Sequence, residues 1–141
     1  SYGFDVDIAA PGQNIWSTLN NNTYGTKSGT SMATPLVSSA AALVAAKYPQ
    51  LSGPAIGEIL RLSTDNIYTL SGNSNFVNKL GKGRLNIAKA LESTPNIAIR
   101  KQNIILQDNS DGVLAGGDTV ELAIDLKSIL GNVSNLNVTL S

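Results

Sequence analysis

Apolar side chains follow two different spacings along the chain, and the spacing changes near Pro95. Before that point, alternation of apolar and polar side chains over residues 4–10 predicts a strand, which Pro11 and Gly12 close. The three asparagines at residues 20–22 then predict the turn of a hairpin. Helical spacing takes over after the hairpin.

Three helices are expected in this first part. The first begins at Thr30 or Ser31 as its N-cap and has small residues on one side, which suits a helix inside a domain. Its apolar face consists of Leu36, Val37, Ala40, Leu43 and Val44. The second helix has Ser52 as its N-cap and Pro54 in its first turn. A shorter third helix covers about residues 85–91.

After Pro95 the apolar positions recur at every second residue, which is typical of strands. The pattern predicts strands within residues 97–106, 120–126 and 136–140. Turn-forming sequences separate them at residues 109–112, 116–118 and 131–132. Because these strands are too few to close a β-sandwich, residues 95–141 are expected to be the beginning of an accessory domain.

Composition narrows the classes of partner and of chemistry. Ten basic and ten acidic residues give a net charge of zero, so neither nucleic acid nor an anionic membrane surface is expected as a partner. The uncharged run between Lys27 and Lys47 contains too many Gly, Ser, Thr and Pro residues for a membrane span. Cysteine is absent, which excludes a disulfide scaffold and thiolate chemistry. Histidine is absent too, so a hydrolase mechanism would need residues from outside this chain.

Candidate chemistry concentrates in residues 29–35, which read GTSMATP. A serine hydroxyl is a weak nucleophile until a base takes its proton. Gly29 permits a close backbone approach, and a helix that begins near Ser31 directs N–H groups toward a reacting carbonyl, which favours an oxyanion. The alternative is that Ser31 only caps the helix. Asp5 and Asp7 alone supply too few oxygen ligands for a metal site, so no metal is expected.

Three stretches resemble one family, the subtilisin-like serine proteases (subtilases). GTSMATP resembles the signature around that family's catalytic serine. Residues 6–12, VDIAAPG, are similar to the strand that precedes this serine, and residues 81–86, GKGRLN, to the glycine turn that ends the catalytic domain. The resemblance covers roughly residues 1–91, with the three matches in the family's order. One departure is Leu36, where many relatives have a histidine that is not the catalytic base.

The resemblance implies an α/β fold and a set of residue roles. Residues 1–94 would be the C-terminal portion of a subtilisin-like three-layer parallel-sheet domain, followed in residues 95–141 by a partial all-β, immunoglobulin-like sandwich. Ser31 would be the nucleophile and would supply one oxyanion donor through its own N–H. Thr30 would support the oxyanion region. The leaving-group side of the cleft would be lined by Lys27, Ser28 and Gly29.

The expected function is that of a bacterial, secreted or cell-surface serine endopeptidase that acts through an acyl-enzyme on Ser31. The catalytic aspartate and histidine are expected upstream of Ser1, so this chain is interpreted as an excised fragment that is inactive alone. Its partners would be a polypeptide substrate and the upstream part of the same protease, with no cofactor. Exposed strand edges favour a strand-swapped homodimer of the isolated chain. Two alternatives remain: a catalytically dead binding module, and an adhesion or sorting module built on the β-rich tail.

Overall fold

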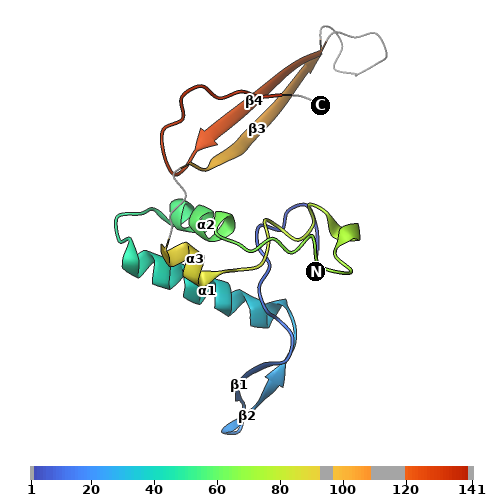
Figure 1. Cartoon of the computed structure of the whole chain (residues 1–141), viewed down its shortest axis with the longest axis vertical. Helices are drawn as coiled ribbons and strands as arrows, with labels where there is room; N and C mark the ends of the chain where they lie inside the picture. The colour runs from blue at the N-terminus through green and yellow to red at the C-terminus, as the bar shows by residue number, and fades with distance from the viewer. Residues whose placement is uncertain (1, 93–96, 109–119, 140–141) are drawn as a thin grey trace. The chain divides into compact units, whose positions relative to one another are not determined.

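The computed structural model describes residues 2–92, 97–108 and 120–139 (Figure 1). The chain divides into two compact units, Ser1–Pro95 and Asn96–Ser141. The first unit combines helices with a short antiparallel hairpin, and the second contains one longer antiparallel hairpin. None of the helices in the described residues is long and apolar enough to cross a membrane.

The hairpin predicted around the asparagine run is confirmed. β1 (Ile15–Leu19) pairs antiparallel with β2 (Thr23–Lys27), with Leu19 opposite Thr23 next to the turn. Asn21 and Asn22 have φ angles of 61° and 54°, a left-handed conformation that asparagine tolerates better than most residues. The local turn chemistry therefore sets the register of the hairpin.

α1 (Thr30–Lys47) follows the hairpin, and its start differs from the prediction. Gly29 is the N-cap, and no side chain makes a capping hydrogen bond there, so the assignment of Thr30 or Ser31 as N-cap is wrong. The physical reason is the φ of 149° at Gly29, a conformation that glycine adopts easily and that ends the extended backbone of β2 before Thr30. Pro35 is the sixth residue of this helix and has no N–H, so the carbonyl oxygen of Ser31 lacks its usual donor four residues on.

α2 (Gly53–Leu62) begins as the sequence predicts. The Ser52 side chain accepts a hydrogen bond from the backbone N–H of Ala55 at 3.4 Å, and proline occupies the first turn. α3 (Ile87–Glu92) begins two residues later than predicted, because Asn86 caps it by accepting a hydrogen bond from the N–H of Lys89 at 3.0 Å. A one-turn 3₁₀ helix, η1 (Ser74–Phe76), lies between α2 and α3.

The three α-helices pack against one another and form the core of the first unit. The buried apolar side chains come from all three: Ala40, Val44, Ala55, Ile59, Leu60 and Ala90. The end of α1 is tied to the end of α3, because Lys47 and Tyr48 both donate hydrogen bonds to the carbonyl oxygen of Leu91. On α2, the buried Glu58 forms an ion pair with the partly buried Arg61, with 2.6 Å between Oε2 and Nη2. The two hydrogen bonds from Arg61 to the same carboxylate oxygen fix the geometry of this pair.

The strand predicted at residues 4–10 does not form. This segment instead runs beside the glycine turn, with Ala9 donating to Gly83 at 2.9 Å and accepting from Leu85 at 2.7 Å. These bonds make a single parallel bridge between Ala9 and Arg84. A strand needs a partner that stays alongside for several residues, and the turn does so only briefly. Apart from this bridge and an antiparallel one between Asp65 and Arg84, the described residues contain two antiparallel two-stranded sheets and no parallel sheet.

A polar cluster around Asp65 holds the same glycine turn from its other side. Asp65 and Arg84 exchange two backbone hydrogen bonds of 2.9 Å. The Asp65 carboxylate accepts hydrogen bonds from Lys89 Nζ at 2.6 Å, from Asn86 Nδ2 at 3.0 Å and from Arg84 Nη2 at 3.4 Å. The bonds from Lys89 and then Asn86 are the main cause that lowers the pKa of Asp65 from 3.8 to about 2. The cluster therefore joins the end of α2, the turn and the start of α3.

The second unit contains β3 (Ile99–Asp108) and β4 (Val120–Ser128), which pair antiparallel and confirm two predicted strands. The predicted third strand is wrong for residues 136–139, which form no strand. Leu136 instead lines a cavity beside Ile99 and Leu126, so the chain packs next to the hairpin rather than pairing along its edge. Residue 140 and the turns predicted at residues 109–112 and 116–118 lie outside the described residues.

Candidate active site

Two glycines fix the backbone at the start of α1. The N–H of Gly29 donates to the carbonyl oxygen of Gly12 at 2.7 Å, and a Cβ placed on Gly12 would lie 2.8 Å from the carbonyl oxygen of Gly29. Gly29 itself has a φ of 149°, which other residues rarely adopt. The segment before the hairpin and the residue before α1 therefore approach more closely than side chains would allow.

Ser31 lies exposed in the first turn of α1 and does not cap it. Neither its hydroxyl nor its backbone N–H has a hydrogen-bond partner among the described residues. The first N–H groups of any helix lack intrahelical acceptors, and the dipole makes this end partly positive. The alternative that Ser31 serves only as a cap is therefore wrong, and both polar groups remain available to a ligand.

A cavity of about 350 Å³ joins Ser31 to the hairpin. Met32 and Pro35 of α1 line it with Ser31. The hairpin contributes the rest of the lining: Ile15, Ser17, Thr18, Leu19, Asn20, Gly25 and Lys27. Lys27 is the only charged residue in this lining, so the cavity offers a peptide apolar surface, a few hydroxyl and amide groups, and one cation.

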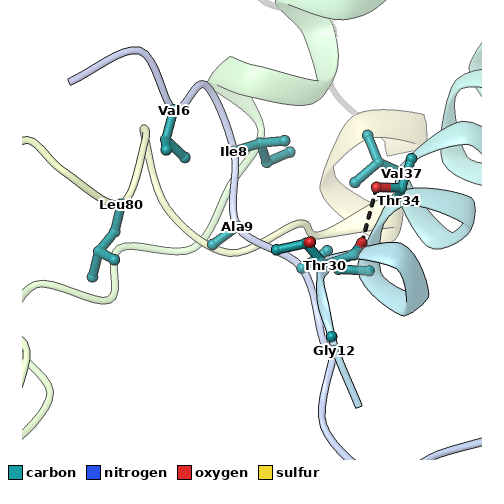
Figure 2. Close-up of a pocket in the computed structure, with 11 residues that line it drawn as sticks. Val6, Ile8, Ala9, Gly12, Thr30, Thr34, Val37 and Leu80 are labelled. Carbon is teal, nitrogen blue, oxygen red and sulfur yellow. Dashed lines mark hydrogen bonds between the residues drawn. The ribbon is translucent and has the colours of Figure 1, made fainter. Parts of the chain in front are cut away.

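A larger cavity of about 550 Å³ involves the same helix start but not Ser31 (Figure 2). Its lining is mostly apolar, and it includes Val6, Ile8, Val37 and Leu80. Figure 2 shows Thr30 beside this cavity, with the Thr34 hydroxyl donating to the Thr30 carbonyl oxygen at 2.9 Å. Ser31 does not line this larger cavity and belongs to the smaller one.

The predicted site residues fall into three places. Lys27 and Ser31 share the smaller cavity, whereas Gly29 and Thr30 line the larger one. Ser28 lines neither, because its hydroxyl accepts a hydrogen bond from the backbone N–H of Asn14 at 2.9 Å. This bond ties the chain before β1 to the chain after β2.

Sequence reasoning missed the supports of the site. Gly12 was interpreted as the end of a strand, and its role in receiving the Gly29 N–H was not predicted. Asn14, with a φ of 54°, was not singled out at all. The Pro-Gly pair at residues 11–12 indicates a turn-like backbone conformation, but the sequence does not show that Gly12 pairs with Gly29 on the other side of the hairpin.

The described residues do not complete a hydrolytic site. The chain has no histidine to act as general base. No described carboxylate is hydrogen-bonded to Ser31, and no three potential metal ligands among His, Cys, Asp and Glu come together in the described part of the chain. The arrangement therefore places a free hydroxyl and a free N–H beside a cleft, without a general base among the described residues.

The chain is similar to known bacterial proteases over the part that contains this site. It is 38% identical over 92 residues to subtilisin DY from Bacillus licheniformis, an alignment that covers 65% of this chain and 31% of that protein. It is 40% identical over 92 residues to subtilisin NAT from Bacillus subtilis subsp. natto, covering 65% of this chain and 22% of the relative. The chain thus spans less than a third of the length of these relatives.

A solved structure and a family model agree with these similarities. A protease from Pseudoalteromonas arctica matches 64% of this chain and 30% of its own chain, with a TM-score of 0.55 and 29% sequence identity. The model of the subtilase family matches residues 1–83, which include the helix start with Ser31 and the first half of the glycine turn at residues 81–86. Because this match covers more than half of its 141 residues, the chain belongs to the subtilase family of serine proteases.

Proposed function

We propose that this chain supplies the nucleophile of a serine endopeptidase. The observation that carries the proposal is the uncapped, exposed position of Ser31 in the first turn of α1, beside a cavity open to a substrate. Ser31 Oγ attacks the scissile carbonyl while a base takes its proton. The amine then leaves with a proton, and water hydrolyses the acyl-enzyme.

The start of α1 stabilises the charge that develops on the carbonyl oxygen. The free N–H of Ser31 donates to the oxyanion, and the positive end of the helix dipole acts in the same direction. Gly29 keeps side-chain atoms away from the helix start, and Thr30 supports the backbone that follows it. Lys27 and Ser28 belong to the side of the cleft from which the amine departs.

The general base and its orienting carboxylate come from a segment upstream of Ser1. The chain contains no histidine, and it covers only 31% of subtilisin DY and 22% of subtilisin NAT. We use the word parent for the longer polypeptide in which such a segment precedes this chain. Loss of the base from a serine protease triad lowers turnover by roughly 10⁶-fold, so the isolated chain has no measurable activity.

The upstream segment also completes the core of the first unit. Leu43 of α1 is 49% exposed, and the 550 Å³ cavity beside Thr30 has a mostly apolar lining. Covering these surfaces with strands and helices of the parent gives the three-layer parallel-sheet domain of which residues 1–94 are the last portion. Without this cover, exposed apolar surface and open strand edges favour a strand-swapped homodimer.

Residues 95–141 begin an immunoglobulin-like sandwich in this proposal. On the β3–β4 hairpin, Ile104 lies opposite Ile124 and Leu106 opposite Leu122, so one face is apolar. The other face is mixed, because Asn103 and Asp125 are polar whereas Ile105 and Ala123 are apolar. The apolar face with Ile104 and Leu106 requires a second sheet to cover it. We place the action of the parent on polypeptides outside a bacterial cell or at its surface, because the relatives are bacterial subtilisins.

Labelling with a fluorophosphonate, followed by intact-mass measurement, tests this function. The reagent is applied to the parent, to this chain alone, and to the Ser31→Ala variant of the parent. The expected result is one adduct on the parent, none on the isolated chain and none on the variant. A folded parent without an adduct would contradict the proposal and favour a catalytically dead binding module.

A further inference from the structure

We propose that Lys27 makes the cleft beside Ser31 selective for polypeptides that carry an aspartate or a glutamate close to the scissile bond. The inference rests on the proposed function, because it concerns the substrate that Ser31 attacks. It adds a substrate class, which neither the family match nor the geometry of the nucleophile specifies.

The register of the hairpin places Lys27 on the face that lines the cavity. Lys27 is the last residue of β2 and lies opposite Ile15. Directly opposite residues share one face of a hairpin, and alternate residues along a strand share that face too. Ser17 and Leu19 alternate with Ile15, and all three line the same 350 Å³ cavity as Lys27 and Ser31.

The charge of Lys27 is not neutralised within the described part of the chain. Among the described residues, no carboxylate lies within ion-pair distance of its ammonium group. Within the first unit, Arg61 pairs with Glu58, and Arg84 and Lys89 pair with Asp65. Like Lys27, the side chains of Lys47, Lys79 and Lys82 form no ion pair with a described carboxylate, but they do not line this cavity. Residues 28–46 contain no charge at all, so no neighbour along α1 offsets the ammonium group.

The rest of the lining contains only uncharged groups. Ser17, Thr18 and Asn20 are polar, and Ile15, Leu19, Met32 and Pro35 are apolar. A basic substrate side chain therefore meets repulsion here with no compensating carboxylate, whereas an acidic one gains an ion pair. The lysine side chain is long and flexible, so it serves several substrate positions near the scissile bond rather than a single one.

The expected selectivity is modest, because Lys27 is exposed. Ion pairs at exposed positions change equilibrium constants by about two- to fivefold. Screening by salt weakens such pairs, so the preference falls as ionic strength rises. This salt dependence separates an effect of charge from an effect of side-chain shape.

Matched peptides cleaved by the parent test the inference. Pairs of peptides carry Asp or Asn, or Glu or Gln, at each position from the third residue before the scissile bond to the third after it. We expect the acidic member to have an about two- to fivefold higher kcat/KM at one or more positions. Lys27→Gln should bring the ratio of acidic to amide peptide to about one, Lys27→Arg should retain it, and Lys27→Glu should bring it below one.

The control is Lys82→Gln, which removes an exposed lysine of the same unit that lines neither cavity and should leave the ratio unchanged. A parent that cleaves both members of every pair equally overturns the inference and leaves the proposed function intact. The same holds if Lys27→Gln keeps the acidic preference. A parent that cleaves none of the peptides and takes up no fluorophosphonate overturns the proposed function as well.

Discussion

α1 and α2 both begin close to a serine, yet the two serines do different things. At α2, the hydroxyl of Ser52 accepts the N–H of Ala55 at 3.4 Å and satisfies one of the free groups of the helix end. At α1, the cap is Gly29, which has no side chain, and Ser31 follows two residues later without any capping bond. Ser52 uses its oxygen to stabilise the fold, whereas Ser31 keeps its oxygen and N–H free.

In the proposed function, this difference leaves the start of α1 free for a substrate. A side-chain cap at position 29 would place an oxygen against the N–H groups that an oxyanion needs. The glycine avoids this competition, and its hydrogen bond of 2.7 Å to Gly12 replaces the cap as the feature that fixes the helix start. In the proposed function, the helix start without a side-chain cap is the part that binds the substrate oxyanion.

Exchange of each serine for alanine gives the largest expected contrast. In the parent, Ser31→Ala should lower kcat by roughly 10⁶-fold, because no other group replaces the nucleophile. Ser52→Ala should leave kcat at its original value, because this hydroxyl bonds only to its own helix. Peptide hydrolysis under saturating substrate measures both variants. Substantial turnover by Ser31→Ala would show that another residue is the nucleophile.

Addition of a methyl group at Gly12 should disturb the start of α1. The new Cβ would lie 2.8 Å from the carbonyl oxygen of Gly29 and 3.3 Å from the Cβ of Ala33, so the helix start has to move. A shift of about 1 Å at a catalytic group can cost roughly 10²-fold in rate, and we expect a loss of that order in kcat/KM for Gly12→Ala in the parent.

The matched control is Gly57→Ala in α2, where an added Cβ meets nothing within 4 Å. This change should leave kcat/KM unaltered and stabilise the helix by about 1 kcal/mol, because alanine is the better helix former. Equal losses of kcat/KM in the two variants would contradict the role assigned to the contact between Gly12 and Gly29.

Removal of the Ser52 cap should affect stability alone. Ser52→Ala is expected to lower the free energy of unfolding by about 1 kcal/mol, because the N–H of Ala55 loses its acceptor. Urea unfolding of the parent and of the variant measures the difference. An unchanged free energy of unfolding would show that the Ser52 cap does not stabilise α2, and it would contradict the contrast drawn between Ser52 and Ser31.

Acid should weaken the Asp65 cluster but not the starts of α1 and α2, because neither helix has an acidic residue in its first turn. The folded pKa of Asp65 is lowered from 3.8 to about 2, so its stabilising contribution is fully present above pH 3.8 and is lost as the pH falls toward 2. Asp65→Asn should remove this part of the pH dependence. The free energy of unfolding, measured between pH 2 and pH 6 for both proteins, tests it; equal slopes would contradict the lowered pKa.

Short-range features of the fold could be predicted from the sequence. The asparagine run at residues 20–22 fixes its turn through its own φ preferences, and the order of Ser52 and Pro54 marks the start of α2. Both signals act within a few residues. The prediction of a strand at residues 4–10 was wrong because the hydrogen-bond partner of this segment is a turn about 75 residues further along the chain. The local alternation of apolar and polar residues does not show that this partner is too short to pair with a whole strand.

The site was predictable in part for the same reason. The motif at residues 29–35 identifies Ser31, and Lys27 shares its cavity as expected from their closeness in sequence. The cap at Gly29 was missed because its φ of 149° depends on the contact with Gly12, 17 residues earlier. The division of the predicted residues between two cavities likewise depends on packing that spacing alone does not encode.

The most direct test of the contrast between the two serines is to locate the acyl group. The parent is mixed with a nitrophenyl ester of a peptide, quenched with acid during the initial burst, digested and mapped by mass spectrometry. The account predicts an acyl group on the peptide that contains Ser31, none on the peptide that contains Ser52, and none on either peptide of the isolated chain. A burst with the acyl group on any other residue, or an active parent with unmodified Ser31, would contradict it.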